Sequence, residues 1–500
     1  MTRAVPVALA VLALALAGPA TGADILRIGI GPEPETLDPH RGLTLGAGRV
    51  LQELCEGLLT RDGSGRTVPG VAERWEQSAD GLTWTFHLRR DASWWNGDRL
   101  TADDFVRGWR RAVDPATASG IADLLDGVAN ATAIRQGQLP PEQLGIQALD
   151  ADRLEVRLAR PSADFDMVLA HRITLPVHGP TLEKAGNGFA AADRLVCNGP
   201  YRLAGHQLHS AYHLVRNDYY RTPPAMTAVE LVVSDGPEME LNLFRTGALH
   251  VTSSLPGAMV GWARQEMPGS LHIHPWTMLT YLRANQNGPA WRDNPAFLTA
   301  LALALDRDQL TAPSQGRAIP AHGLVPPGLW RESGQAAADI PANTARQQAA
   351  RDALTRAGYG PSRPPPKVEI LHAATEPVRQ RVVAIAAQWK QVLGVETELV
   401  GQESRIVTQR GASGNFNGFV LNTWISYAPS YALAAFLPPG TVLPADEPGL
   451  RALERQILES GRIIPISFGS SQRLVSPALR GWQDNVYDIH PVSQLSLAGD

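Results

Sequence analysis

Residues 368–400, VEILHAATEPVRQRVVAIAAQWKQVLGVETELV, decide the fold class of this 500-residue chain. The run 368–371 is short, apolar and partly β-branched, which predicts a strand. Thr375 is a helix N-cap residue, and the helix that follows ends at Gly394, a residue type that commonly closes helices. The run 395–400 predicts the next strand. A strand, a helix and a strand at this spacing form a right-handed parallel crossover, so the sequence predicts an α/β lobe.

Other parts of the chain also have the patterns of short strands and capped helices. Strands are predicted at 26–30, 84–88 and 152–158, where apolar and polar residues alternate. Helices are predicted over 50–59, after the cap residue Thr101, and from Asn343 to Gly358. Since a chain of this length is too long for one core, we expect two or three lobes.

The N-terminus has the three parts of a secretory signal peptide, which we assign to residues 1–23. Arg3 is positive, the run 5–17 is apolar, and the small residues Thr21 and Ala23 precede the cleavage point. The apolar run is shorter than the roughly 18 residues that span a bilayer, so we expect cleavage and no membrane anchor. No cysteine lies near the cleavage point, which predicts export to the periplasm without a lipid anchor.

The chain has two cysteines, Cys55 and Cys197. In an oxidising compartment an even number of cysteines favours a disulfide. The alternative is two separate buried thiols, and the sequence does not choose between the two.

The sequence contains no motif for catalysis. It has no nucleophile elbow, no phosphate-binding loop and no HExxH helix. His206, His209 and His213 are neighbours, but in a strand His206 would point away from the other two, so we interpret them as the polar face of a β-meander and not as a metal site. The formal net charge of −4 provides no basic surface for nucleic acid. We therefore predict a protein without enzymatic activity, cofactor, metal or nucleic-acid partner.

An ordered series of short motifs resembles one protein family, the periplasmic oligopeptide-binding proteins of ABC importers of the peptide and nickel class. No single motif is specific for the family, but the order of the motifs along nearly the whole mature chain is specific for it. The motifs are ETLDPH at 35–40, LCEGLL at 54–59, VPGVAERW at 68–75, LTWTFHLR at 82–89, WNGD at 95–98, NGPY at 198–201, ALDR at 304–307 and IHP at 489–491.

The resemblance implies an α/β protein with the two-lobed periplasmic binding protein fold, in which a hinge lets the lobes close over a ligand. It also implies an extra subdomain in the first lobe, and a crossing between the lobes near 259–281. The implied division is 24–66 for the first part of lobe I, 67–182 for the extra subdomain, 183–275 for the second part of lobe I, 276–464 for lobe II, and 465–500 for the C-terminal part of lobe I.

The family also implies a function. A monomeric periplasmic receptor would bind a peptide or peptide-like ligand and dock on ABC permease subunits in the inner membrane. The ligand would lie extended between the lobes, and main-chain groups would bind its backbone as they bind an added strand. By resemblance, the ligand path would be lined by the backbone of Gly42 to Leu45, with Leu43 and Thr44 between them, and of Asn422, Thr423 and Trp424. We also expect aromatic walls from Trp276, Tyr281, Trp424 and Tyr427, for each of which core packing is the alternative, and a ligand position at Ser426.

The chain departs from the family at the position that binds the ligand's amino group. Family members that bind peptides usually have an aspartate there, and the corresponding residue is Ser426, between Ile425 and Tyr427. Val420, where some relatives have an arginine, is also apolar. Because a buried ammonium group without a carboxylate partner is costly, we expect a ligand other than a simple peptide with a free amine.

Several alternatives stay open at this stage. The ligand could be a capped, cyclic or modified peptide, or a non-peptide such as a metal chelate, haem, a metallophore or a glycoside. A periplasmic hydrolase would require a nucleophile and a base in the cleft, and the sequence provides no such pair. A third class is a chaperone or signalling protein that has lost transport.

Overall fold

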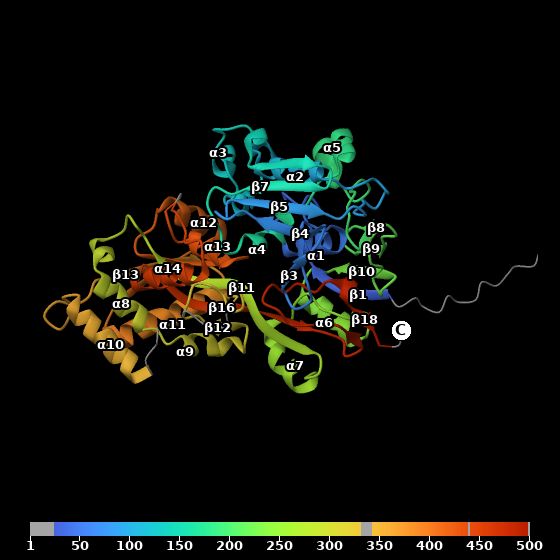
Figure 1. The fold of residues 1–500 in the computed structure, drawn as a ribbon. Helices are drawn as coiled ribbons and strands as arrows, with labels where there is room; N and C mark the ends of the chain where they lie inside the picture. Colours follow the sequence, from blue (N-terminus) through green and yellow to red (C-terminus); the bar gives the residue numbers. More distant parts are fainter. Residues whose placement is uncertain (1–24, 332–342, 439–440, 499–500) are drawn as a thin grey trace, which may run out of the picture.

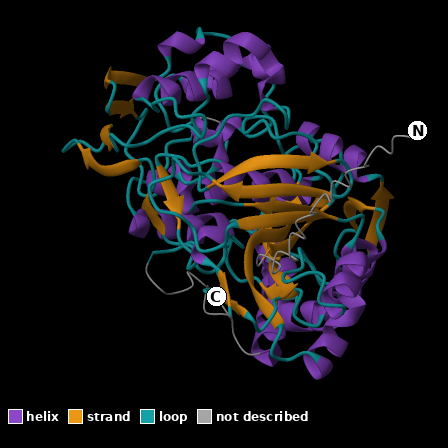
Figure 2. Cartoon of the chain, turned by 90° about the vertical axis from the view of Figure 1, so that its right-hand side faces the viewer, coloured by secondary structure: helices purple, strands orange, loops and turns teal. Residues whose placement is uncertain are grey.

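The computed structural model describes residues 25–331, 343–438 and 441–498, so the predicted signal peptide at 1–23 lies outside the described residues. The molecule has two lobes (Figure 1), and the strands lie mainly in the interior with helices toward the outside (Figure 2). Among the described residues, no helix combines the length and the apolar character needed to cross a bilayer.

Lobe I is built on a four-stranded sheet. Its order is β1 (Ile25–Gly31), β10 (Ala228–Val233), β9 (Ala211–Arg216) and β8 (Tyr201–Gln207), with β1 parallel to β10 and the other pairs antiparallel. The buried Leu26 of β1 belongs to the same core as Val475 and Val492. The N-terminal and C-terminal segments therefore pack in one lobe, as the family resemblance implied.

A second sheet lies within the predicted extra subdomain. It is antiparallel, in the order β4 (Ala72–Gln77), β5 (Thr83–Leu88), β7 (Arg153–Arg157) and β6 (Ile146–Asp150). Helix α2 (Ala102–Val113) begins with a capping box between Thr101 and Asp104, and its Trp109 is buried with Phe86 of the sheet. The hairpin of β2 (Leu59–Arg61) and β3 (Thr67–Pro69) precedes this sheet.

Lobe II contains the predicted parallel crossover. Strands β13 (Val368–Ala373) and β14 (Thr397–Gln402) pair in parallel, and α11 (Glu376–Leu393) connects them and buries Trp389 against the sheet. The full sheet has the order β12 (Ala318–Pro320), β16 (Ile463–Leu474), β11 (Leu271–Ala284), β15 (Phe419–Ile425), β13 and β14. The remaining helices of this lobe are α8 (Pro295–Leu303), α9 (Arg307–Thr311), α10 (Asn343–Arg356), α12 (Ser404–Ser413), α13 (Pro429–Ala434) and α14 (Glu447–Glu459).

The long strands β11 and β16 connect the lobes (Figure 1). Leu271 to Pro275 pair with Leu474 to Ser470, and Leu279 to Arg283 pair with Phe468 to Ile463. The register shifts between Pro275 and Leu279. A proline and a break in the ladder at this point leave fewer backbone hydrogen bonds to resist bending. The lower-numbered half of β11 lies within the predicted crossing at 259–281.

The remaining elements lie in lobe I and its subdomain. The helices are α1 (Leu45–Leu54), α3 (Ala131–Arg135), α4 (Phe165–Leu169), α5 (Gly179–Ala185), α6 (Pro237–Arg245) and α7 (Val260–Glu266). A short C-terminal pair is formed by β17 (Leu479–Arg480) and β18 (Ser496–Leu497).

Two local predictions were wrong. The helix expected over 50–59 is α1, Leu45–Leu54, because the backbone becomes extended at Cys55 and the N–H of Gly199 binds the carbonyl of Leu54 at 2.8 Å. His209 lies in the turn between β8 and β9 with a φ of 58°, not in a strand. Its backbone N–H and the ring of His206 both bind Glu33.

A disulfide joins Cys55, at the end of α1, to Cys197, which precedes β8. The two cysteines are therefore bridged and are not separate buried thiols. The bridge fixes α1 to the sheet of lobe I. The two cysteines are 142 positions apart.

We expect the double variant Cys55→Ser, Cys197→Ser to lose about 2–5 kcal/mol of unfolding free energy, since the bridge closes a long loop in the unfolded chain. Urea unfolding followed by circular dichroism measures this loss. The wild-type protein in reductant should match the double variant in oxidising buffer. Equal urea midpoints for the oxidised wild-type protein and the double variant would contradict the expectation.

Glu53 gives a second test of this region. Its side chain is buried, accepts the Val492 N–H at 3.1 Å, and has its pKa raised from 4.5 to about 8 by burial. Because the folded state retains a proton that the unfolded state releases, stability should fall as pH rises from about 4.5 to 8.

The variant Glu53→Gln keeps an acceptor for Val492 but does not ionise. We expect it to be more stable than wild type by about 1–3 kcal/mol at pH 8 and equal to it at pH 4.5. Urea unfolding across this pH range measures the difference, with the exposed Glu183→Gln as the control that shows none. A difference independent of pH would refute this assignment.

Candidate ligand cavity between the lobes

A partly open cavity with about 1050 Å³ of empty space lies where the two lobes meet. Lobe I, the hinge, lobe II and the C-terminal segment all contribute to its wall. The side chains used below are Leu45, Arg49, Arg61, His171, Arg172, Trp276, Ile425, Tyr427, Tyr487 and Asp488.

Polar contacts between the subdomain and lobe II close the structure beside this cavity. Asp164 accepts the backbone N–H of Ser430 at 2.7 Å and its hydroxyl at 2.6 Å. The Tyr431 hydroxyl donates to Asp123 at 3.1 Å, and Arg331 donates to Asp166 at 2.5 Å. These three contacts join the subdomain to lobe II, and together they are called the latch.

Aromatic rings form a wall beside the latch. The ring of Tyr427 lies 4.4 Å from that of His171, across the gap between the lobes. Trp424 stacks on Tyr431 at 5.3 Å, and the Tyr487 hydroxyl donates to the Tyr427 carbonyl at 3.3 Å. Rings held in this way offer flat apolar surface with polar edges, which suits a ligand with both characters.

The structure places the predicted site residues in three groups. Leu45, Trp276 and Tyr427 line the cavity. Tyr281 is buried in the core of lobe II against Phe436, away from the cavity wall. The third group lies outside the wall and consists of Leu43, Thr44, Asn422, Thr423, Trp424 and Ser426. The last four of these are neighbours in sequence of Ile425, which lines the cavity.

The backbone around Thr44 is already occupied. Thr44 is the N-cap of α1. The backbone N–H groups of Leu43 and Thr44 both donate to Glu35, and the Gly42 carbonyl accepts from Arg172 at 2.7 Å. These groups have partners within the chain, so they are not free to bind a ligand backbone in this conformation.

The backbone of β15 differs. It pairs with β11 along its whole length, but with β13 only through Phe419 and Val420. From Leu421 to Ile425, this edge of β15 has no strand partner in the described part of the chain. An extended ligand could pair with such an edge.

Ser426 lies at the end of this edge and is fully buried. Its backbone N–H donates to the Thr277 carbonyl at 3.0 Å, and its hydroxyl oxygen has no hydrogen-bond partner. No carboxylate stands at this position.

The model of family 5 of the bacterial extracellular solute-binding proteins, in its middle region, matches residues 66–441. The chain belongs to this family. The periplasmic oligopeptide-binding protein OppA of Escherichia coli is 30% identical over 504 residues, covering 91% of this chain and 90% of OppA. The periplasmic murein peptide-binding protein MppA of the same organism is also 30% identical, with the same coverage.

Solved structures agree with this assignment. The unliganded open form of MppA superposes with a TM-score of 0.82 at 27% identity, covering 95% of this chain and 98% of MppA. The complex of Haemophilus influenzae OppA with RPPGFSPFR gives a TM-score of 0.73 at 26% identity, covering 95% and 99%. The chain is therefore a two-lobed solute-binding protein of the periplasm.

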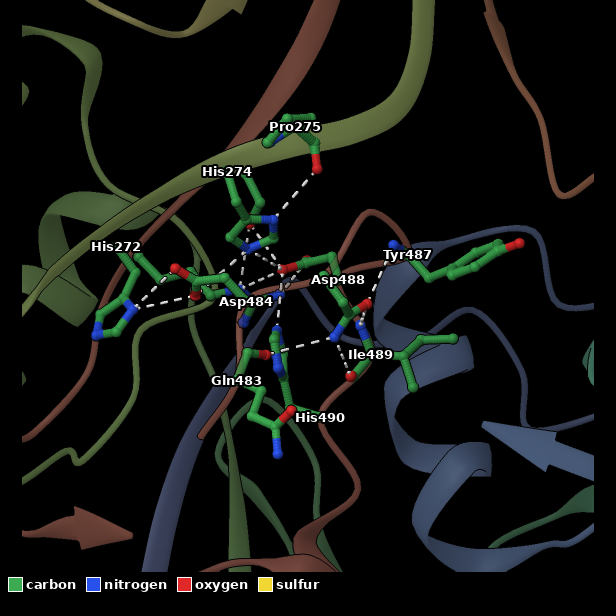
Figure 3. A network of polar contacts seen from close by, with 12 residues as sticks. His272, His274, Pro275, Gln483, Asp484, Tyr487, Asp488, Ile489 and His490 are labelled. Carbon is green, nitrogen blue, oxygen red and sulfur yellow. Dashed lines mark hydrogen bonds and ion pairs between the residues drawn. The ribbon is translucent and has the colours of Figure 1, made fainter. Parts of the chain in front are cut away.

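Asp488 is the carboxylate on the cavity wall of this solute-binding protein, but its charge is engaged. Arg473, which is 3% exposed, binds both of its oxygens, and Ser471, His490 and Arg49 also contact it. Burial alone would raise the pKa of Asp488, yet Arg473, His490 and Arg49 hold it well below its usual range. It is an ionised group whose charge is balanced inside a network (Figure 3).

His274, Asp488 and His490 point toward one another (Figure 3), and their ligand atoms lie within 4.8 Å of one another. Such a group could hold a metal ion. However, Arg473 already binds the same carboxylate, and a buried guanidinium opposes a second cation there. We therefore interpret the group as part of the ion-pair network.

Four residues that line the wall were not predicted from the sequence: Arg49, Arg61, His171 and Arg172. None of the four lies in one of the family motifs, and arginines are common in this chain. Only the folding of three distant segments toward one cavity identifies them.

Removing the charge of Asp488 should destabilise the fold. We expect Asp488→Asn to cost about 3–5 kcal/mol near neutral pH, because it leaves Arg473 buried without its partner. Since the folded pKa of Asp488 is lowered, its contribution is present above the usual pKa near 3.8 and is lost as pH falls below it.

Urea unfolding of wild type and variant at pH 7 and at pH 3 measures both effects, and the gap should narrow at the lower pH. The control is Asp484→Asn, at a side chain that is 37% exposed, where we expect a change of about 1 kcal/mol or less. Equal costs for the two variants would contradict this role for Asp488.

Proposed function

We propose that this solute-binding protein delivers a peptide or peptide-like ligand to an ABC importer, and that the ligand is not a simple peptide with a free amine. The unpaired edge of β15 beside the cavity is the observation that carries the peptide part of the proposal. The names of OppA and MppA support the same ligand class.

The second part of the proposal depends on the acidic groups near the cavity. Ser426 stands where the family's aspartate is expected, Asp488 is bound to Arg473, and Glu35 accepts from Leu43 and Thr44. A ligand ammonium in this cavity would lose water without gaining a free carboxylate. An N-blocked, cyclic or otherwise modified peptide avoids that cost.

The proposed cycle involves binding and motion only. A solute enters the gap, the lobes close at the register break in β11, and the latch of Asp164, Asp123 and Asp166 forms. Each contact between ligand and lobe II adds to the free energy of closure. The closed form then docks on permease subunits, and none of the wall residues is required to make or break a bond.

A non-peptide ligand is the second candidate. The probable deoxycholate-binding protein YgiS of Escherichia coli is 31% identical over 77% of this chain and 72% of its own length. The apolar and aromatic wall near Trp276 and Tyr427 would also fit such a rigid, amphipathic molecule.

Calorimetry with Ala-Ala-Ala and its N-acetylated form tests the proposal. We expect the acetylated peptide to bind at least about tenfold more tightly, because it removes an unpaired ammonium from the cavity. The variant Ser426→Asp should reverse this preference by supplying a carboxylate partner. The exposed Ser404→Asp adds the same charge elsewhere in lobe II and should leave it unchanged. Tighter binding of the free-amine peptide to the wild-type protein would refute the proposal.

A further inference from the structure

Three arginines from separate segments of lobe I reach the cavity wall. Arg49 comes from α1, Arg61 from β2, and Arg172 from the turn that follows α4. Arg61 is 5% exposed, and Arg49 and Arg172 are partly buried. Guanidinium groups at a wall of low polarity generate a strong local field, because little water screens them.

The hydrogen bonds of these arginines go mainly to neutral groups. Arg172 donates to the Gly42 carbonyl, and its Nε is buried without a partner. Arg61 donates to the carbonyls of Gly65 at 3.2 Å and Met167 at 2.9 Å. Neither guanidinium has a carboxylate within ion-pair distance among the described residues.

Arg49 is the only one of the three with a carboxylate contact. Its distance to Asp488 is 3.5 Å, whereas Arg473 binds that carboxylate much more closely. The other contacts of Arg49 are the carbonyls of Ile30 and Ser253, each at 3.3 Å. Burial lowers the pKa of Arg49 to about 10, so it is a cation at neutral pH.

The charge on the wall is therefore unbalanced. Asp488 is matched by Arg473, which lies behind the wall, and no other carboxylate of the described part of the chain lines the wall. Glu35, Asp166 and Glu240 act on the three arginines only from outside the wall. His171 adds no charge to the wall, since burial and the neighbouring Arg172 lower its pKa well below the usual value and leave its ring neutral. A cavity of this kind attracts an anion and repels a cation.

We propose that the ligand carries at least one carboxylate or similar acidic group, and that Arg172 and Arg61 bind it from lobe I. This inference rests on the proposed function and adds an acidic group to its ligand. Arg172 is the better placed of the two, because it lines the cavity beside Tyr427, and its bond to the Gly42 carbonyl leaves other N–H groups of the planar guanidinium for a carboxylate.

The test uses two matched pairs of probes in calorimetry. The peptide pair is Ac-Ala-Glu-Ala and its neutral analogue Ac-Ala-Gln-Ala-amide, and the non-peptide pair is deoxycholate and its methyl ester. We expect the acidic member of at least one pair to bind tenfold or more tightly than its neutral partner. The preference should weaken as salt rises from low to physiological concentration, because salt screens partly exposed charges.

Three variants locate the effect. Arg172→Gln should lose most of the preference, Arg172→Lys should keep part of it through its charge, and the exposed Arg405→Gln should keep all of it. Circular dichroism and the urea midpoint confirm that each variant is folded. If Arg172→Gln unfolds, the salt dependence and the probe pairs of the wild-type protein still decide the question.

The outcomes separate the two proposals. Acidic preference in the non-peptide pair alone supports this inference and overturns the peptide function. Peptide binding without acidic preference supports the peptide function and overturns this inference. A preference that survives Arg172→Gln, or no measurable binding of either acidic probe at 1 mM, overturns it as well.

Discussion

The backbone ladder between β11 and β16 is the constraint on which the rest of the structure depends. Both strands belong to the sheet of lobe II, and their far ends reach the core of lobe I through Leu474 and Val475. Two hydrogen-bonded strands resist stretching and shear but can bend where pairing is interrupted. The interruption between Pro275 and Leu279 therefore places the bend next to Trp276, on the wall of the cavity.

The same region carries the main buried charge network. Arg473 and Ser471 are on β16, His274 is on β11, and all three contact Asp488 of the C-terminal segment. The network ties that segment to the hinge strands on the lobe I side. Burying these charged groups costs desolvation free energy, and only their attraction for one another offsets that cost. Their geometry fixes the wall of the cavity that stays with lobe I when lobe II moves.

Much of the fold could be predicted from the sequence, because local patterns determined it. The cap at Thr101 and the crossover at 368–400 both depend on neighbours along the chain. The helix at 50–59 was misplaced because its end depends on a distant residue, Gly199, whose N–H binds Leu54. The disulfide from Cys55 was undecided for the same reason: it joins residues whose proximity only the fold creates.

The site could be predicted less well, and its charge explains why. The resemblance pointed to Trp276 and Tyr427 on the wall, but it also suggested Tyr281, which packs in the core. A family pattern can show that an expected carboxylate is absent at Ser426, but it cannot show which other charged groups line the cavity.

Besides Asp488, the charged groups on the wall are the three arginines of lobe I, which can bind an anion, whereas Ser426 of lobe II has no charge with which to bind a cation. The arginines and Ser426 face the same ligand. A negative charge that the arginines of lobe I attract must therefore not be repelled by lobe II when the lobes close. A neutral Ser426 avoids the repulsion that a carboxylate there would exert on an acid. In the proposed function, the neutral Ser426 and the three arginines of lobe I thus favour the same ligand, an acid without a free amine.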